Sequence, residues 1–554
     1  RRAILIRSVI SLLFALLVGA GVSSQWQSWL FFRNRVDFGI VDQQFGIDVG
    51  FYVFQLPFLT FVVNWVFAAI IVIFVVTTIE HYLNGGIRIQ GQPGSRVTPQ
   101  VKAHLSLLLG LLALVKGAGY YLDRYELTLS ERGFVTGATY TDIKAQLPAL
   151  QLLMIVSVFC FGLLIFNIWR RGFTYPIIAV GLWALVASLA GTIYPALVQR
   201  FQVEPSESTK EAPYIERNIE MTRLAMGLAD VTPRNFDYEP TLTAKEIEEN
   251  MATVRNVRLL DPAVMRDTFQ QTQGIKSFYD FRDIDVDRYE IDGRTTQVVL
   301  AARELKQTDL PNSSWESEHI AFTHGYGIAA APANAIDANG RPDYALADIP
   351  VAARPGASSL DVDLPGLYVG EGLKGYAIVG AARDEVDFQD NDDRTEVTRY
   401  DGADGVNINS LPRKLAFALR FAEPNLVVSG ELGSDSRILY KRDVLDRAKT
   451  LAPFLKFDRD PYPAIIDGKV TWILDAYTST DMFPYAQKVN PRAVRSGDLR
   501  SSVNYVRNSV KVVIDAYDGT PEFYIVDDRD PIAKSYRQQF PDLFTDDAPP
   551  KELT

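Results

Sequence analysis

The sequence has almost no thiols and few imidazoles. Its 554 residues include one cysteine, Cys160, and four histidines. Because Cys160 lies in a long apolar segment, the rest of the chain has neither a disulfide nor a thiolate site. A disulfide-stapled scaffold and a cysteine-rich zinc site are therefore excluded.

Signatures of nucleotide and hydrolytic chemistry are also missing. The sequence has no phosphate-binding P-loop, no His-Glu-x-x-His zinc motif and no Gly-x-Ser-x-Gly nucleophile elbow. Gly370, Gly372 and Gly375 have the spacing of a dinucleotide-binding loop. A strand-like run follows them instead of a helix, so no helix N-terminus is available for a pyrophosphate. These absences argue against a nucleotide-dependent enzyme.

Charge is scarce in the first part of the chain and abundant in the rest. Up to residue 199 there are 14 Lys+Arg and 8 Asp+Glu, which leaves 42 and 59 of the chain's 56 and 67 for the remainder. The two parts thus carry +6 and −17, and the whole chain −11. This contrast predicts a membrane anchor followed by a water-soluble region. Nucleic acid is not an expected partner, because the acidic part has no basic patch with interleaved aromatics.

Five apolar windows are long enough to cross about 30 Å of hydrocarbon, which takes roughly 20 helical residues. They cover residues 4–24, 58–79, 103–121, 150–168 and 175–197. The first window is not interpreted as a signal peptide, because it lacks a small-residue cleavage site and four further spans follow. Residues 1–199 are therefore predicted to form an α-helical transmembrane bundle in contact with membrane lipids.

Basic residues are distributed unevenly around these windows. With the N-terminus in the cytoplasm, the inner segments hold eight basic residues and one acid, and the outer loops hold five basic residues and seven acids. This arrangement satisfies the positive-inside rule, and the opposite orientation would violate it. Five spans then place the residues after about 200 outside the cytoplasm. We expect a multi-pass plasma-membrane protein with a large extracytoplasmic part.

Three features of the anchor allow a functional interpretation. Lys116, near the end of the third window, indicates either transport or simple snorkelling of its amino group to the lipid headgroups. Asn64 is interpreted as a hydrogen-bonding contact between helices or as a substrate ligand, and Gly117 as a site of close helix contact. The aromatic segment 45–58 is expected to lie along the outer membrane interface.

Helix and strand signals alternate in the acidic part, which predicts an α+β region. Thr243 and Glu246 form a capping box at the start of one helix. Further helices are expected at 213–226, 262–274, 411–422, 443–452 and 531–539. Runs of β-branched and aromatic residues predict strands at 295–303, 374–380 and 469–475. Asp467-Gly468 predicts a hairpin turn.

Weak self-similarity divides this region in two. The segment LDAY (474–477) recurs as IDAY (514–517), each at the end of a strand-like run. This echo predicts two related α+β lobes, 200–400 and 401–554, with a boundary near 395–410 and a second lobe that is truncated at its C-terminus. Similar chemistry at the ends of unrelated strands is the alternative explanation.

His324 is the catalytic candidate of the chain. It stands in the glycine-rich loop THGYG (323–327), and a neutral imidazole serves both catalysis and metal binding. No cluster of carboxylates or cysteines at ligand spacing accompanies it. The alternative is a histidine that caps a glycine-rich turn.

Acidic loops offer oxygen ligands of the kind that calcium prefers. Asp337, Asn339 and Asp343 surround a tight glycine turn, as in calcium-binding loops. A second loop contains Asp384, Asp387, Asp390, Asp392 and Asp393. Neither loop has the full twelve-residue pattern with its terminal glutamate, so a solvated acidic surface is the alternative. Calcium is the cofactor that these loops suggest, and no other cofactor is expected.

Eight segments spread along almost the whole chain point to a family. They are DFGIVDQQFGIDVGFYVFQLPF (37–58), YYLDRYELTLS (120–130), GATYTDIKAQLPA (137–149), LLDP (259–262), VLAAREL (299–305), FTHGYGIAAAPAN (322–334), YVRNSVKVVIDAYDGT (505–520) and DPIAKSY (530–536). Together they resemble the large membrane proteins of uncharacterised protein family 0182, known from actinobacteria and cyanobacteria. The resemblance implies a multipass plasma-membrane protein without an assigned activity. Since family members look longer, it also implies that this chain begins after one or two spans and stops within the external region.

Three functional hypotheses follow from these patterns. The first is a non-enzymatic scaffold of the cell envelope, which binds other envelope or membrane proteins or forms a homo-oligomer. The second is transport or handling of lipid or envelope precursors by Lys116, Asn64 and segment 37–58. The third is an extracytoplasmic hydrolase that uses His324 with a nearby carboxylate.

Overall fold

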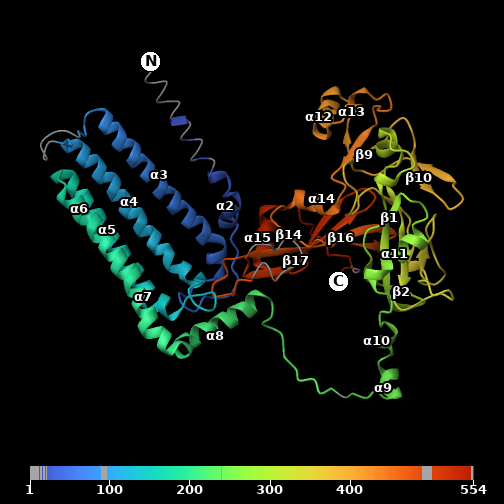
Figure 1. The fold of residues 1–554 in the computed structure, drawn as a ribbon, viewed down its shortest axis with the longest axis horizontal. Helices are drawn as coiled ribbons and strands as arrows, with labels where there is room; N and C mark the ends of the chain where they lie inside the picture. Colours follow the sequence, from blue (N-terminus) through green and yellow to red (C-terminus); the bar gives the residue numbers. More distant parts are fainter. Residues whose placement is uncertain are drawn as a thin grey trace.

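The computed structural model describes residues 11, 12, 15, 19, 21–88, 96–238, 240–489, 502–550 and 553. Within them the chain divides into an N-terminal group of long helices, the helical region, and a C-terminal part built on β-sheets, the sheet region (Figure 1). Much of the expected first span, 4–24, lies outside the described residues, so that span stays a prediction.

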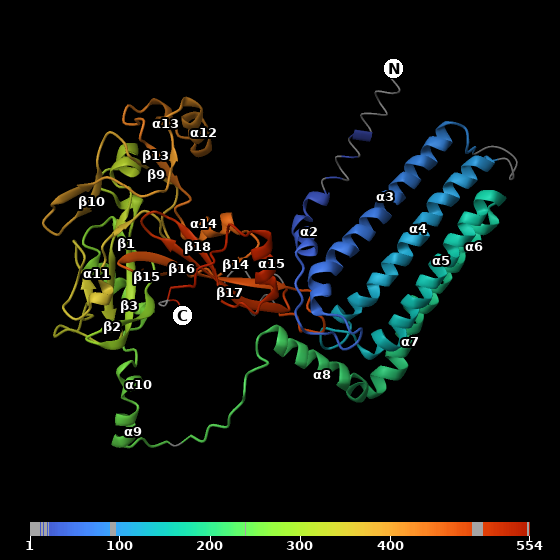
Figure 2. The same cartoon turned by 180° about the vertical axis from the view of Figure 1, so that it is seen from behind.

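Among the described residues, four helical segments are long and apolar enough to cross a membrane. They are Phe51–Leu83, Pro99–Leu129, Asp142–Arg170 and Thr174–Ala225. Four of the expected spans, from 58–79 to 175–197, fall within these segments and are confirmed as long apolar helices. Each long helix packs against the next one in chain order, so the helices lie side by side in a row (Figures 1 and 2).

The helical region contains α2 (Trp26–Arg33), α3 (Leu56–Leu83), α4 (Pro99–Glu126), α5 (Leu147–Arg170), α6 (Thr174–Ser188), α7 (Tyr194–Val198) and α8 (Glu207–Ala225). Helix α4 has Pro99 in its first turn, where the missing N–H would have no helical partner. In α3 and α5 the proline instead follows a π-helical turn, at Phe51–Gln55 and at Asp142–Gln146. A Cβ at Gly117 of α4 would lie 3.1 Å from the Cβ of Ser157 in α5, which confirms the close helix contact expected at this glycine.

The strands of the sheet region are β1 (Tyr279–Phe281), β2 (Asp285–Ile291), β3 (Arg294–Leu305), β4 (Gly325–Tyr326), β5 (Ile328–Pro332), β6 (Leu346–Ala347), β7 (Ala352–Ala353), β8 (Gly366–Leu367), β9 (Tyr376–Val379), β10 (Glu385–Gln389), β11 (Thr395–Thr398), β12 (Val406–Asn407), β13 (Arg437–Tyr440), β14 (Lys456–Phe457), β15 (Tyr462–Ile466), β16 (Lys469–Thr480), β17 (Tyr505–Asp515) and β18 (Pro521–Ile525). A six-stranded sheet has the order β1-β3-β5-β6-β7, and β2 also pairs with β3. A five-stranded sheet has the order β14-β16-β17-β18, with β15 paired to β16. The smaller sheets are β12-β13-β9, β10-β11 and β4-β8.

The helices of the sheet region are α9 (Ala244–Glu249), α10 (Met251–Arg255), α11 (Pro262–Gln273), α12 (Leu411–Phe421), α13 (Asn425–Val428), α14 (Val444–Leu451) and α15 (Pro531–Gln539). The capping box of Thr243 and Glu246 is confirmed at the start of α9. The hairpin turn at Asp467-Gly468 is confirmed between β15 and β16. Helix α8 begins at Glu207, earlier than the expected residue 213, because it continues through Pro213.

The largest hydrophobic core joins the two regions. Val53 and Phe54, in the π-helical turn just before α3, and Met221 of α8 share it with Trp472 and Val512 of the five-stranded sheet. Burial of one continuous apolar cluster fixes the sheet region against the base of the helical region. Within the sheet region, β9 pairs with β13 on the far side of the interval 395–410. The division into two lobes stays a prediction.

Candidate functional site

The aromatic segment before α3 lies at the junction between the helical and sheet regions. The ring of Phe38 lies 5.9 Å from that of Phe54, and 5.8 and 5.6 Å from those of Phe483 and Tyr505 in the sheet region. The central residues of segment 45–58 are buried against protein at this junction. The expectation that the segment lies along the membrane interface stays a prediction. Aromatic residues suit both environments, so their presence did not distinguish them.

Polar side chains also fix this junction. Asn218 of α8 is buried, and its Nδ2 donates to the backbone oxygens of Thr136 at 2.7 Å and Tyr485 at 2.8 Å. Arg507 of β17 reaches the C-terminal end of α8, where its Nη2 donates to the Leu224 oxygen at 2.6 Å. Arg507 thus satisfies a carbonyl that has no partner within the helix.

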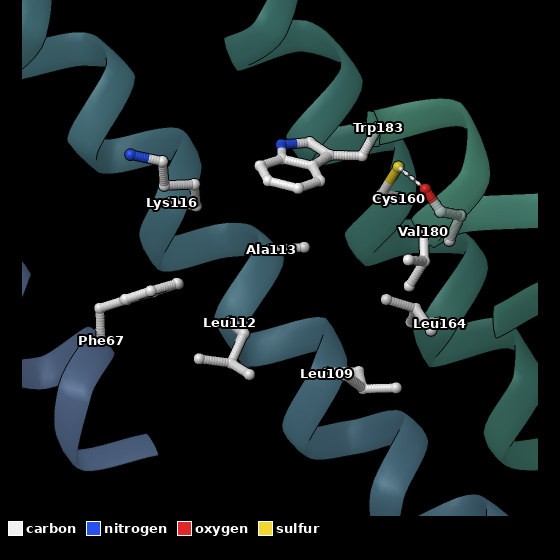
Figure 3. A pocket seen from close by; sticks show the side chains of 10 residues that line it. Phe67, Leu109, Leu112, Ala113, Lys116, Cys160, Leu164, Val180 and Trp183 are labelled. Carbon is white, nitrogen blue, oxygen red and sulfur yellow. Dashed lines mark hydrogen bonds between the residues drawn. The ribbon is translucent and has the colours of Figure 1, made fainter. Parts of the chain in front are cut away.

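A cavity of about 180 Å³ lies within the row of membrane helices (Figure 3). Leu109, Leu112 and Lys116 of α4 line it together with Cys160 of α5 and Trp183 of α6. Figure 3 shows that the amino group of Lys116 points away from Trp183. An apolar cavity of this kind suits a hydrocarbon chain.

The two polar residues expected within the membrane are both on the described helices. Lys116 is half-buried, and its Nζ lies 4.6 Å from the centre of the Tyr120 ring, where a cation is attracted to the aromatic face. Asn64 is exposed on α3. A hydrogen bond between helices comes from Asn167, which sequence reasoning missed, since its Nδ2 donates to Ser106 Oγ at 2.7 Å. A polar residue at the end of the fourth apolar window was the available signal.

His324 lies in a cluster of hydrogen-bonding side chains just before β4. Its Nδ1 is 2.8 Å from Thr323 Oγ1, and its Nε2 is 3.4 Å from Asp387 Oδ1. Its ring stacks on Tyr368 with 4.3 Å between the ring centres. Thr323 and Tyr368 both donate to Oε2 of Glu385, at 2.5 and 3.0 Å. A hydroxyl, an imidazole and carboxylates thus come together, as in sites of nucleophilic catalysis.

This cluster is closed to solvent. His324 is 3% exposed and Thr323 0% exposed, so a substrate reaches the threonine hydroxyl only after a local opening of the fold. The hydrogen bonds connect the loop before β4 to β10 and satisfy polar groups that burial would otherwise leave unpaired. A catalytic role for His324 stays a prediction.

Arg442 and Glu385 were not recognised from the sequence, although they complete the same cluster. Arg442 is buried and donates to the backbone oxygens of Tyr368, at 2.8 Å from Nε, and of Thr323, from Nη2. Its Nη1 has no hydrogen-bond partner among the described residues. Burial lowers the pKa of Arg442 to about 10. The available signal was a basic pair, Lys441-Arg442, directly after an apolar strand.

The spaced glycines bind a carboxylate of their own chain. Glu304 at the end of β3 is buried and accepts the backbone N–H groups of Glu371 and Gly372, each at 2.7 Å. A Cβ at Gly370 would lie 2.8 Å from Cδ of Glu304, so glycine is needed for this approach. Successive N–H groups form a concave anion site. Burial nevertheless raises the pKa of Glu304 to about 7.

The first group of calcium candidates is engaged in local contacts. Asp337 Oδ1 accepts the backbone N–H groups of Asn339 and Arg341, both at 2.8 Å. Asp343 forms an ion pair with Arg354 at 2.5 Å. These bonds hold the turn around Gly340 and occupy carboxylate oxygens that a cation would need.

In the second group, Asp384 pairs with Arg399 at 2.5 Å, and Asp390 Oδ1 accepts the backbone N–H of Asp392 at 2.9 Å. Asp387 belongs to the histidine cluster described above. Among the residues that the structure describes, no group of three or more His, Cys, Asp and Glu side chains is arranged to hold a metal ion. Calcium binding by either loop stays a prediction.

Another acidic group lies where loops of the two large sheets approach each other. Burial, together with the neighbouring Asp283 and Asp460, raises the pKa of Asp285 to about 8. Burial and the charge of Glu304 likewise raise the pKa of Glu371 to about 7. Carboxylates that share a poorly solvated space disfavour one another's ionisation. Asp285 and Glu371 therefore hold protons near neutral pH.

Residues 228–255, here called the arm, leave the body after α8 and carry α9 and α10 (Figures 1 and 2). Phe236 is 88% exposed and Leu242 77% exposed. Further exposed apolar residues of the arm are Leu228, Val231, Tyr238, Ile247 and Val254. A groove of about 780 Å³ runs along α8 and is lined by Ile215, Ile219 and Leu224 among others. Exposed apolar surface of this extent marks an interaction site.

Comparison with known proteins gives a consistent result. The model of an uncharacterised protein family, UPF0182, matches residues 1–553. A UPF0182 protein of Frankia alni is 42% identical over 558 residues, which cover 97% of this chain and 54% of the relative. UPF0182 proteins of Saccharopolyspora erythraea and Streptomyces coelicolor are 40% and 38% identical, over 98% and 97% of this chain and 58% and 55% of their own lengths.

The chain spans about half the length of the curated relatives it matches. No solved structure matches it.

Proposed function

The chain belongs to the uncharacterised protein family UPF0182, and we propose that it is a membrane-anchored, non-enzymatic scaffold of the cell envelope that assembles with further copies of itself. In this proposal the helical region crosses the plasma membrane, with the N-terminus of this chain in the cytoplasm and the sheet region outside. The positive-inside distribution of basic residues supports that orientation.

The arm is the observation that carries the proposal. Its apolar side chains, with Phe236 and Leu242 the most exposed, have no cover within the described chain, although the region around them is acidic and water-soluble. A second copy offers a matching surface, namely the groove beside Ile215 and Ile219 of α8. Because the membrane holds all copies in one orientation, the arm and the groove of neighbouring copies lie in the same layer.

The junction between the two regions supports the same role. Asn218 and Arg507 join α8 to the sheet region by hydrogen bonds, and the largest core continues from one region to the other. A scaffold needs its binding surfaces in a fixed position relative to the membrane. A shared core with buried hydrogen bonds provides that position, whereas a loosely tethered domain would not.

The oligomeric state tests this proposal. The full chain is purified in mild detergent, and the molar mass of the protein component is measured by light scattering. We expect a defined oligomer for the unmodified chain and a monomer for the double variant Phe236→Ser/Leu242→Ser. The control is Ile336→Ser, which replaces an exposed apolar residue outside the arm. A monomeric unmodified chain, or an oligomer that the arm variant leaves intact, contradicts the proposal.

The cavity between the membrane helices favours a second candidate function, the handling of a lipid or envelope precursor. Its apolar lining suits an acyl or isoprenoid chain, with Lys116 at one edge for an anionic headgroup. Ala113→Phe fills the cavity, whereas Val158→Phe places the same ring on an exposed position of α5. Native mass spectrometry of the full chain is expected to show a bound lipid that only Ala113→Phe removes. Equal lipid retention by both variants excludes this function.

A further inference from the structure

Helix α12 has apolar residues on two opposite faces. Phe417 and Phe421 pack inward on a core that contains Ile378 and Ile438. On the other face Leu411, Leu415 and Leu419 recur at four-residue intervals, and they are 60%, 45% and 83% exposed. Val428 of the adjacent α13 is also exposed. Three leucines in a row on a water-facing helix are unusual, because a soluble domain normally keeps that face polar.

The charges on α12 are all of one sign. The helix contains Arg413, Lys414 and Arg420 and no acidic residue, although the chain after residue 199 carries −17. Arg413 and Arg420 are exposed on the flank of α12 between the leucine row and the inward-facing phenylalanines, since successive helical residues lie about 100° apart around the axis. Among the described residues, Arg413 uses Nη1 for the Asn407 oxygen and Arg420 lies over the Tyr440 ring, so both keep further N–H donors. Basic residues beside an apolar stripe are typical of helices that lie in a membrane interface.

The basic surface continues next to α12. Lys374 and Lys441 line a cavity of about 320 Å³ together with Arg420. Asp446 offsets part of this charge through an ion pair with Lys441 at 2.7 Å. Asp443 lines the same cavity, so Lys374, Lys441 and Arg420 leave a small basic excess beside α12. Such an excess attracts phosphate groups, whereas the acidic surface of the rest of the sheet region repels them.

The position of α12 directs this surface toward the membrane. In Figures 1 and 2, α12 and α13 lie at the edge of the sheet region on the side toward which the membrane helices extend from the junction. The arm with α9 and α10 lies at the opposite edge. Since the junction is fixed by a shared core, the helical region holds α12 near the same bilayer.

We infer that the exposed face of α12 rests on the leaflet adjacent to the sheet region, with its leucines in the interface and Arg413 and Arg420 on anionic lipid headgroups. The membrane is favoured over a protein partner because the helical region tethers α12 to it, which makes contact effectively intramolecular. This inference is independent of the proposed assembly through the arm.

A fluorescent probe on the leucine row tests the contact. Leu419→Cys, in a Cys160→Ala background of the full chain, is labelled with an environment-sensitive dye. The protein is reconstituted in phosphatidylcholine vesicles with or without about 30% phosphatidylglycerol, doped with a headgroup-nitroxide lipid. The control is Val264→Cys, an exposed position on α11. We expect a blue shift and several-fold quenching at position 419 in the anionic vesicles and neither effect at position 264.

The charge requirement is tested in the same assay. Arg413→Ser/Arg420→Ser is expected to reduce the quenching at position 419 to its level in neutral vesicles. Arg394→Ser/Arg529→Ser removes two other exposed basic residues and is expected to have no effect. The inference is overturned if quenching at position 419 equals that at position 264. It is also overturned if quenching at position 419 changes neither with lipid charge nor with removal of the two arginines. If burial of the dye depends on the protein-to-lipid ratio instead of on lipid charge, the leucine face contacts a second copy of the chain. That result also overturns the inference.

Discussion

The two regions of this chain differ in which side chains they bury and which they expose. In the helical region apolar residues such as Ile155 and Ile177 are exposed, as lipid-facing residues must be. In the sheet region Arg303 and Arg442 are buried, whereas the arm and α12 each expose several apolar residues. The comparison teaches that an exposed leucine can be interpreted only when it is known whether the leucine faces lipid or water. It is ordinary on α5, and it indicates an interaction surface on α12.

The largest expected effect concerns the buried arginine of the sheet region. Arg442→Met keeps the length of the side chain but removes the hydrogen bonds to the Tyr368 and Thr323 oxygens and the positive charge near Glu385. We expect the free energy of unfolding of the sheet region to fall by about 3–5 kcal/mol, because a buried acid and two buried carbonyls lose their partner. Denaturant titration of the full chain, followed by intrinsic fluorescence, measures the loss.

Arg529→Met is the control for this variant, because the Arg529 side chain is 83% exposed. It is expected to change the unfolding free energy by less than about 0.5 kcal/mol. Similar losses of unfolding free energy in both variants would mean that burial does not make Arg442 more important for stability than an exposed arginine.

The second prediction concerns the boundary between the two regions. Asn218→Ala leaves the backbone oxygens of Thr136 and Tyr485 without their donor in a buried site. We expect a loss of about 1–3 kcal/mol, measured as a lower melting temperature of the sheet region in the full chain. Asn391→Ala, at an exposed loop position, serves as the control. An unchanged melting temperature would show that the apolar core alone holds the regions together.

The difference between the regions also explains what the sequence could predict. The spans 58–79 to 175–197 were predictable because hydropathy reports the lipid environment of each segment directly. The capping box at Thr243 and the turn at Asp467-Gly468 were predictable because both are made by neighbours in the sequence. Local patterns of this kind do not depend on the tertiary fold.

The candidate sites depended on contacts that no local pattern reports. The sequence singled out His324 and the spaced glycines. The carboxylates that form hydrogen bonds at these two places, Glu385 and Glu304, lie on strands distant in sequence. The core contacts of Phe54 in segment 45–58 were likewise hidden from the sequence, because that core includes Tyr505 of β17. Residue type identified polar groups that need partners, and only the fold showed which partners they have.

A third, smaller effect is expected in the pH dependence of the sheet region. Burial and neighbouring acids raise the pKa of Asp285 to about 8 from an ordinary value of 3.8. Between these values the folded state retains a proton that the unfolded state has lost, so stability is full below about pH 4 and falls as pH rises toward 8. Asp285→Asn is expected to flatten this decline and to raise the stability of the folded state at pH 8.

Melting temperatures of the full chain between pH 5 and pH 8 measure this effect, with Asp267→Asn on the surface of α11 as the control. A variant whose melting curve keeps the pH dependence of the unmodified chain would show that Asp285 is ionised in the folded state.

The smallest effect is expected for the charge within the helical region. The Nζ of Lys116 lies over the Tyr120 ring, a contact worth about 0.5–1 kcal/mol where it is partly exposed. Lys116→Ala loses that contact but gains helix propensity, so the melting temperature of the helical region should hardly change. Lys102→Ala removes a comparable contact, with Phe173 at 4.4 Å, and is the matched control. If Lys116→Ala alone were as damaging as Arg442→Met, the helical region would depend on a charge that the lipid environment disfavours. Lys116 would then need a ligand or partner of its own, and lipid handling would become the leading function.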